Sequence, residues 1–130
     1  MIAVDTSALM AILRKEVMGE ACEAALKVDQ PILISAGTLT EALIVARRKG
    51  ALPGMSVLLE KLELTVINVT ADVAQACLEA YQLWGKGFHP AELNYGDCFS
   101  YVAAKGNDCP LLYVGKDFSQ TDIRSALAPA

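Results

Sequence analysis

Four acidic residues occupy positions from which their carboxylates could act together on a phosphate group. Asp5 and Asp117 each follow a short apolar run, and Glu41 and Asp97 lie in the first turns of two helical patterns. Clustered carboxylates without His or Cys select hard cations such as Mg²⁺ or Mn²⁺. Such a metal positions phosphate oxygens and generates hydroxide for hydrolysis. If the four residues meet, the sequence predicts a metal-dependent nuclease.

The elements that must bring these acids together alternate between strands and helices. Apolar strands alternating with helices predict an α/β fold with a mostly parallel central sheet and helices on both faces. Short apolar or β-branched runs indicate strands at residues 2–4, 31–35, 64–69 and 111–114. Helical patterns occupy residues 7–13, 18–28, 38–49, a segment after Pro53-Gly54, 71–84 and 94–106.

All four acids are expected at one edge of this sheet. Open α/β sheets bind ligands outside the carboxyl ends of their strands, and Asp5 and Asp117 follow strands directly. Glu41 lies on the helix that leaves the 31–35 strand. Asp97 starts a helix that runs back toward the beginning of the last strand, so it also starts at the carboxyl edge. Because crowded carboxylates raise one another's pKa values, the cluster requires a cation among them.

Each acid also has a structural explanation. Asp5 is suited to cap the first helix, and Asp117 to cap a short helix behind the last strand. Asn94 followed by Asp97 resembles a capping box. Glu41 is less easily explained by its favourable place near a helix start, since a strongly apolar stretch follows it and an unpaired carboxylate there is costly.

Composition points to a globular protein. The 130 residues predict a single domain over residues 1–130, and 54% hydrophobic with 20% charged residues exclude a disordered chain. No run reaches the roughly 18 apolar residues of a membrane-spanning helix. The N-terminus lacks the basic leader of a signal peptide. Four scattered cysteines without zinc spacing indicate free thiols and a cytoplasmic protein.

The net charge of −4 argues against nucleic-acid binding when taken alone. A bound cation reverses the local field, so an acidic protein can still attract phosphate. Basic residues that could guide a phosphate backbone, or simply be solvated helix ends, are Arg47, Arg48, Lys49, Lys15, Lys86 and Lys105.

Four segments together resemble the PIN-domain family, and most closely the VapC-type toxins of toxin–antitoxin pairs. The resemblance covers essentially the whole chain in order, spacing and length. The segment around Asp97 is the most specific of the four. The matching segments are Val4-Asp5-Thr6-Ser7-Ala8, Thr40-Glu41-Ala42, Leu93-Asn94-Tyr95-Gly96-Asp97-Cys98-Phe99-Ser100-Tyr101 and Leu112-Tyr113-Val114-Gly115-Lys116-Asp117-Phe118.

The resemblance implies a Mg²⁺- or Mn²⁺-dependent ribonuclease. Asp5, Glu41 and Asp97 fall on the three core acidic positions of the family. Asp117 is the expected fourth acid, with Asp122 as its competitor. The metal would be held by Asp5, Asp97 and Asp117, and Glu41 would bind it or orient the attacking water.

The resemblance also implies partners. A cognate VapB-type antitoxin would block the site, and any contact with promoter DNA would come only through that antitoxin. A homodimer is expected as well, because residues 8–13 and 42–46 form unusually apolar helical stretches that would suit buried surfaces.

Two other functional classes stay open. A non-catalytic PIN-like module would bind RNA or protein with the same fold and without cleavage. A phosphoryl-transfer α/β domain would use a strand-end Asp as nucleophile. A phosphatase of that type needs a second Asp two residues after Asp5, where this chain has Ser7.

Overall fold

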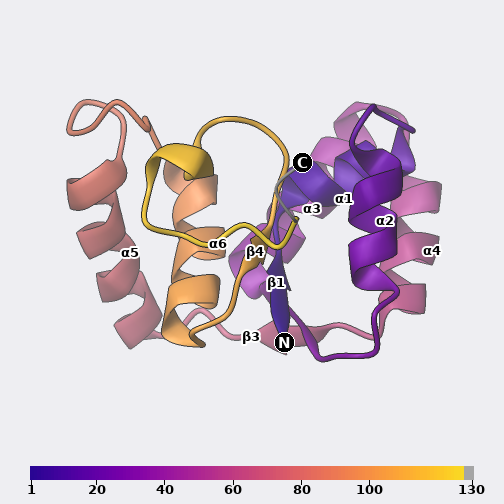
Figure 1. The fold of residues 1–130 in the computed structure, drawn as a ribbon, viewed down its shortest axis with the longest axis horizontal. Coiled ribbons are helices and arrows are strands. Elements are labelled where there is room, and N and C mark those ends of the chain that lie inside the picture. The colour runs from indigo at the N-terminus through magenta and orange to yellow at the C-terminus, as the bar shows by residue number, and fades with distance from the viewer. Residues whose placement is uncertain (128–130) are drawn as a thin grey trace.

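A computed structural model describes residues 1–127 and shows a parallel sheet between two groups of helices (Figure 1). The sheet has four strands in the order β3-β2-β1-β4, and every strand pairing is parallel. The predicted α/β fold is confirmed. The domain predicted over residues 1–130 includes three residues that lie outside the described part of the chain.

Every predicted strand and helix is found, with ends that differ by a few residues. The strands are β1 (Ile2–Val4), β2 (Ile32–Ser35), β3 (Thr65–Ile67) and β4 (Leu111–Leu112). The helices are α1 (Thr6–Leu13), α2 (Gly19–Leu26), α3 (Ala36–Arg48), α4 (Leu52–Leu62), α5 (Ala71–Trp84), α6 (Tyr95–Gly106) and the short 3₁₀ helix η1 (Phe118–Gln120).

The last strand is shorter than the sequence predicts, for a reason that bears on the site. Its neighbour β1 ends at Val4, where the chain turns into α1. Beyond Leu112, β4 therefore has no strand to pair with. The backbone N–H of Val114 donates instead to the hydroxyl of Ser7. The end of the strand thus becomes part of the rim at which the acids gather.

Alternation along the strands builds a separate core on each face of the sheet. Successive strand side chains point to opposite faces. Ile2 and Val4 of β1 pack with side chains of α1 to α4 on one face. Ala3 between them packs with side chains of α5 and α6 on the other face. Figure 1 shows α1, α2 and α4 on one side of β1 and α5 and α6 on the other. Both faces are covered, which explains the continuous apolar strands.

The apolar stretch of α1 is explained by this packing. Ala8, Leu9, Met10 and Ala11 are buried in the core of the chain itself. The expectation that residues 8–13 form a surface for a partner is therefore wrong for residues 8–11, because α2, α3 and α4 already cover them, whereas Ile12 and Leu13 are only partly buried. On α3, by contrast, Leu43 is 36% and Ile44 55% exposed, so part of that stretch faces outward.

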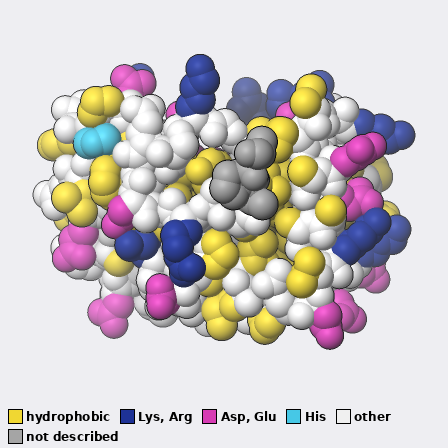
Figure 2. Space-filling view, viewed as in Figure 1, with side chains coloured by type: hydrophobic (Ala, Val, Ile, Leu, Met, Phe, Trp, Pro, Cys, Tyr) yellow, Lys and Arg dark blue, Asp and Glu magenta, His cyan; other side chains and the backbone are white. Residues whose placement is uncertain are grey.

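Charge is dispersed over the visible surface. On the face in Figure 2, hydrophobic side chains gather near the middle, and basic and acidic side chains are interspersed around the rim. Among residues 1–127, no helix combines the length and apolar character needed to cross a membrane. The four cysteines are free thiols, and three of them are buried.

Candidate active site

Asp5 is the most deeply held acid of the candidate site. It follows β1, and its side chain is 4% exposed. One carboxylate oxygen, Oδ2, accepts the backbone N–H of Ser7 at 3.0 Å and the Ser7 hydroxyl at 2.6 Å. The other oxygen, Oδ1, accepts the hydroxyl of Ser100 from α6. Asp5 is thus the N-cap of α1, which was the structural explanation offered for it, and it is also a fixed carboxylate at the sheet edge.

Buried hydroxyl groups tie Asp5 to the surrounding elements. The Thr38 and Ser100 hydroxyls lie 3.0 Å apart, and both side chains are buried. Because the single proton of Ser100 goes to Asp5, Thr38 must donate to Ser100. On the other side, Ser7 accepts from the backbone N–H of Val114 at 3.0 Å. Helices α3 and α6 and the end of β4 therefore fix one carboxylate together.

Glu41 reaches the same edge from α3. Its Oε1 accepts the hydroxyl of Thr6, the residue after Asp5, at 2.6 Å. Burial raises the pKa of Glu41; the Thr6 hydrogen bond acts in the lowering direction, and the charge of Asp5 raises the pKa. The Asp5 and Glu41 carboxylates are therefore close enough to repel each other.

Glycine at position 96 makes room for the Glu41 carboxylate. A Cβ atom at Gly96 would lie 2.1 Å from Oε2 and 2.9 Å from Cδ of Glu41. Any larger residue would push the carboxylate away from the first turn of α6. The close approach of α3 and α6 at this point depends on the missing side chain.

Asp97 lies in that first turn and forms the predicted capping box. The Asn94 side chain accepts the Asp97 N–H at 2.9 Å, and the Asp97 carboxylate accepts the Asn94 N–H at 3.0 Å. Burial raises the pKa of Asp97 to about 7, against a lowering by the Asn94 hydrogen bond. The charges of Asp5, Asp117 and Glu41 contribute smaller parts of the same rise in the pKa. All four acids therefore share one electrostatic environment.

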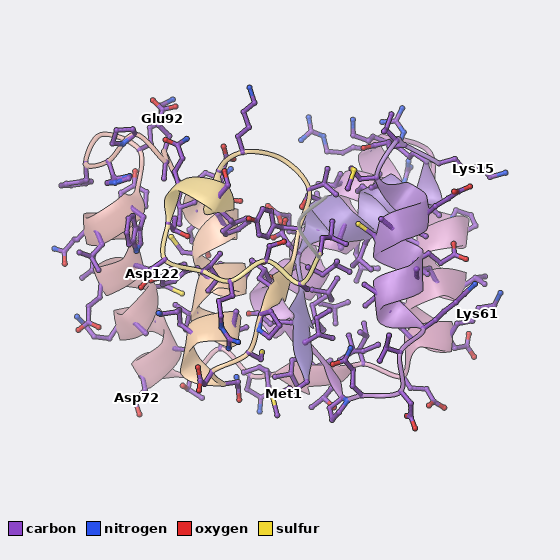
Figure 3. The ribbon with its side chains drawn as sticks, in the orientation of Figure 1. Met1, Lys15, Lys61, Asp72, Glu92 and Asp122 are labelled. Carbon is purple, nitrogen blue, oxygen red and sulfur yellow. The ribbon has the colours of Figure 1, made fainter. Side chains whose placement is uncertain are left out.

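Asp117 and Asp122 differ in what holds them. Asp117 is exposed at the start of η1 and makes no side-chain cap hydrogen bond. Asp122 accepts the Tyr101 hydroxyl at 2.6 Å and lies 2.9 Å from the Lys105 ammonium. Burial favours a higher pKa for Asp122, but these two partners outweigh it and lower the pKa. Figure 3 places Asp122 beside the middle of α6.

The four carboxylates are suited to a hydrated cation. Within residues 1–127, no three His, Cys, Asp or Glu side chains form a ready-made metal site. No basic side chain in that range forms an ion pair with any of the four acids. Mg²⁺ keeps several waters and takes only one or two protein carboxylates, so an open set of oxygen donors fits it. The donor chemistry fits Mg²⁺ or Mn²⁺.

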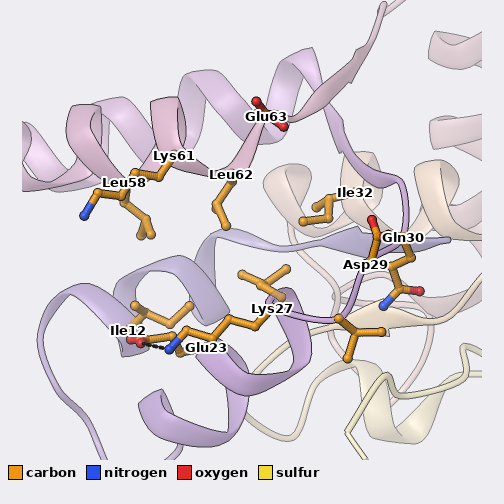
Figure 4. A pocket seen from close by; sticks show the side chains of 12 residues that line it. Ile12, Glu23, Lys27, Asp29, Gln30, Ile32, Leu58, Lys61, Leu62 and Glu63 are labelled. Carbon is orange, nitrogen blue, oxygen red and sulfur yellow. Dashed lines mark ion pairs between the residues drawn. The ribbon is translucent and has the colours of Figure 1, made fainter.

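The hollow seen in Figure 4 lies away from the acids. It has a volume of about 640 Å³ and is lined by apolar side chains such as Ile12 and Leu62 and by charged side chains such as Lys61. An ion pair between Lys27 and Glu23 at 3.1 Å crosses its wall. Ile32, at the amino end of β2, also lines it. None of the four acids does, so this hollow is separate from the candidate active site.

The sequence patterns did not predict several residues that support the acids, among them Thr6, Ser100 and Gly96. Thr6 holds Glu41, Ser100 holds Asp5, and Gly96 admits the Glu41 carboxylate. The one available signal for Thr6 was its place beside Asp5. The partners of Ser100 and Gly96 lie on other helices, so no local pattern predicts them.

The comparison with known families agrees with this fold. The PIN domain model matches residues 2–124. The chain belongs to the PIN-domain family.

Within that family, the chain is similar along its length to proteins of the VapC type. It is 41% identical over 129 residues to Ribonuclease VapC30 of Mycobacterium tuberculosis, covering 97% of this chain and 98% of that protein. It is 41% identical over 123 residues to Ribonuclease VapC of Mycolicibacterium smegmatis, covering 92% and 95%.

Solved structures share the fold at lower identity. VapC20 of Mycobacterium tuberculosis, described as a Sarcin-Ricin loop cleaving toxin, superposes with a TM-score of 0.77 at 18% identity, covering 98% of this chain and 100% of that one. VapBC2 of Rickettsia felis, bound to a DNA fragment from its promoter, gives 0.71 at 17% identity, covering 96% of each chain.

Proposed function

We propose that this protein is a Mg²⁺- or Mn²⁺-dependent endoribonuclease that acts as the toxin of a VapBC-type pair. The observation that carries the proposal is the convergence of Asp5, Glu41, Asp97 and Asp117 at one sheet edge without a basic partner among residues 1–127. The similarity to proteins named VapC ribonuclease over almost the whole chain supports it.

The four acids divide between two proposed roles. Asp5, Asp97 and Asp117 would hold the cation, directly or through water. When bound, Mg²⁺ or Mn²⁺ would polarise a phosphate oxygen and lower the pKa of water. Glu41 would orient the attacking water and take its proton. Its Oε1 is occupied by Thr6, while Oε2 lies beside Gly96 without a hydrogen-bond partner among residues 1–127.

The raised pKa of Glu41 suits it to accept a proton. Burial and the charge of Asp5 make its carboxylate more basic than that of an exposed glutamate. A base whose pKa lies nearer the working pH transfers protons more effectively. The hydrogen bond from Thr6 keeps Oε1 in place, so the proton would go to Oε2.

Cleavage of total cellular RNA by the purified, antitoxin-free protein tests the proposal. Discrete fragments are expected with Mg²⁺ or Mn²⁺ and should disappear with EDTA. Asp97→Asn should remain folded, because Asn preserves a side-chain acceptor at the capping box, and should not cleave. The matched control is Asp72→Asn, which removes an exposed first-turn acid from α5, at the opposite edge of the molecule (Figure 3).

Each outcome of this assay is decisive for the proposal. Fragments lost in Asp97→Asn and retained in Asp72→Asn support the metal-dependent nuclease. Cleavage that persists in EDTA overturns the metal requirement. RNA that binds but stays intact with every metal supports the non-catalytic PIN-like module instead.

We also propose a VapB-type antitoxin as partner and a homodimer as the assembly. Solved structures of toxin–antitoxin complexes with the same fold support the antitoxin. Leu43 on α3, which is exposed and does not line the hollow described below, offers an apolar contact for association. Contact with DNA would occur only through the antitoxin. Light scattering of the isolated protein tests the dimer, and a monomer at micromolar concentration would contradict it.

A further inference from the structure

A second hollow adjoins the acids and has no assigned role. It has a volume of about 480 Å³ and lies between α3 and the first turn of α6. Glu41 and Gly96 form the side that faces the acids. The remaining walls are mostly apolar. They include Gly37, Ile44, Val45, Arg48, Val69, Tyr95 and Phe99.

Tyr95 is an aromatic side chain that the core does not use. It is the first residue of α6 and is 79% exposed. Its ring meets that of Phe99 edge to face, with centroids 5.0 Å apart and planes at 89°. Phe99 is itself buried, so it supports the exposed ring from below. Tyr95 stands two residues before Asp97, at the margin of the candidate active site.

Arg48 supplies a positive charge at the other end of the hollow. It lies seven residues after Glu41 on α3, which places both on the same face of the helix, roughly 10 Å apart along its axis. Ile44 and Val45, one turn from each, form the apolar floor between them. Arg48 is exposed, and no ion pair engages it within residues 1–127.

We propose that this hollow receives a nucleobase of the RNA beside the scissile phosphate, stacked on Tyr95, with Arg48 holding the neighbouring phosphate. This inference rests on the proposed ribonuclease function. A nucleotide presents a flat apolar face next to a charged phosphate, and the hollow offers an aromatic ring and a free guanidinium in the same arrangement. Stacking on one aromatic ring tolerates any base, so the hollow would position the chain rather than select its sequence.

A binding experiment in an inert background tests this proposal. The background is Asp97→Asn, so that RNA is not cleaved during measurement. The probes are a fluorescent single-stranded dodecamer of uridine and its abasic ribose-phosphate counterpart. Tyr95→Ala should weaken binding of the uridine probe by about 5- to 150-fold, the range for one base stacked on an aromatic ring. Tyr95→Phe should restore binding to within about twofold, because its ring can still stack.

Two further variants separate stacking from general effects. Phe88→Ala removes an exposed aromatic ring that does not line the hollow, and its binding should match the background. Arg48→Gln should lower affinity for both probes and reduce the salt dependence by about one phosphate contact. The abasic probe should bind equally to the background and to Tyr95→Ala.

The outcomes distinguish this inference from the function on which it rests. Equal binding of the uridine probe by Tyr95→Ala and the background would overturn the base-stacking hollow and leave the nuclease intact. A similar loss for the abasic probe would show that Tyr95 does not act on a base and would also overturn it. Failure of the background protein to bind any RNA, together with failure of the parent protein to cleave it, would overturn the proposed function itself.

Discussion

The two aspartates that follow β1 and β4 are held in opposite ways. Asp5 is 4% exposed and accepts hydrogen bonds from Ser7 and Ser100 on its two carboxylate oxygens. Asp117 is exposed, and no side chain or backbone group among residues 1–127 is bonded to its carboxylate. Asp5 therefore belongs to a buried half of the site and Asp117 to an open half.

This difference separates the carboxylates that the protein's own groups hold in place from those that a bound ligand would have to hold. In the buried half, hydroxyl groups satisfy Asp5, and Thr6 holds Glu41. In the open half, the charges of three other acids repel the Asp97 carboxylate, whose one hydrogen bond within residues 1–127 comes from the Asn94 backbone N–H. The buried half is thus ordered by the protein's own hydroxyl groups, whereas the open half would gain stability from the proposed cation. The following predictions test this division, from the largest effect to the smallest.

Removing the proposed base should have the largest effect. Glu41→Gln keeps the shape of the side chain and its acceptor for Thr6, but it cannot take a proton. RNA cleavage is expected to fall by about 10²- to 10⁴-fold. Initial rates on total RNA measure this, with the exposed Glu60→Gln on α4 as the control. A rate within twofold of the parent would remove Glu41 from the chemistry.

Removing the Ser100 hydroxyl, which links Thr38 to Asp5, should lower the stability of the buried half. Ser100→Ala leaves the Asp5 oxygen and the Thr38 hydroxyl without their shared partner in a buried place. The free energy of unfolding is expected to fall by about 1–3 kcal/mol. Urea denaturation measures it. Ser119→Ala, which removes an exposed hydroxyl bonded to the Lys116 carbonyl, should change it by less than about 0.5 kcal/mol.

In the open half, a substitution should lower the rate of RNA cleavage and leave the stability of the fold unchanged. Asp117→Asn is expected to reduce cleavage by about tenfold or more, consistent with loss of a metal contact of about 1.4 kcal/mol, and to leave stability unchanged. Asp122→Asn removes the partner of Lys105 and should leave cleavage unchanged, with at most about 1 kcal/mol lost from stability. Cleavage rates and urea curves of the pair test this. The opposite pattern of rates would make Asp122 the fourth acid.

The pH dependence of stability should report the repulsion at Asp97. The pKa of Asp97 is about 7 in the folded protein, whereas the ordinary pKa of an aspartate is 3.8, so the folded state keeps a proton that the unfolded state has lost. Between these pH values the metal-free protein loses stability as pH rises. The melting temperature is expected to fall by a few degrees across this window.

Asp97→Asn should flatten this dependence, and Mg²⁺ should raise the melting temperature most at the high-pH end, where the carboxylate is charged. Calorimetry at several pH values, with and without Mg²⁺, makes the comparison. An equal pH slope in the parent and in Asp97→Asn would show that this carboxylate is not under the expected repulsion.

The sequence predicted the fold and the edge of the sheet at which the acids lie. Apolar runs located the strands, and the direction of a parallel sheet then placed Asp5 and Asp117 on one rim. The capping box of Asn94 and Asp97 was also predictable, because its two residues are only three apart. The catalytic roles of the acids remain predictions.

Other features depend on contacts between distant segments. Ser100 and Asp5 are separated by 95 residues, and Thr6 and Glu41 by 35. Local patterns cannot reveal such pairs, because they arise from helix packing. The same limit explains the incorrect part of the interpretation of residues 8–13, since residues 8–11 are buried in the core of the chain itself. Apolar character alone does not tell whether a helix faces its own core or a partner.

The position of β1 between β2 and β4 has a consequence for synthesis of the protein. Ala3 pairs with Leu111, and the Asp5 N–H donates to the Leu112 carbonyl. The Ser7 hydroxyl accepts a hydrogen bond from the Val114 N–H. Protein domains fold as units, and contacts between such distant residues form late. Until Leu112 and Val114 have left the ribosome, the N-terminal half of the acidic edge lacks these partners. A nascent chain is therefore expected to complete its acidic edge only after residues 111–114 have emerged from the ribosome.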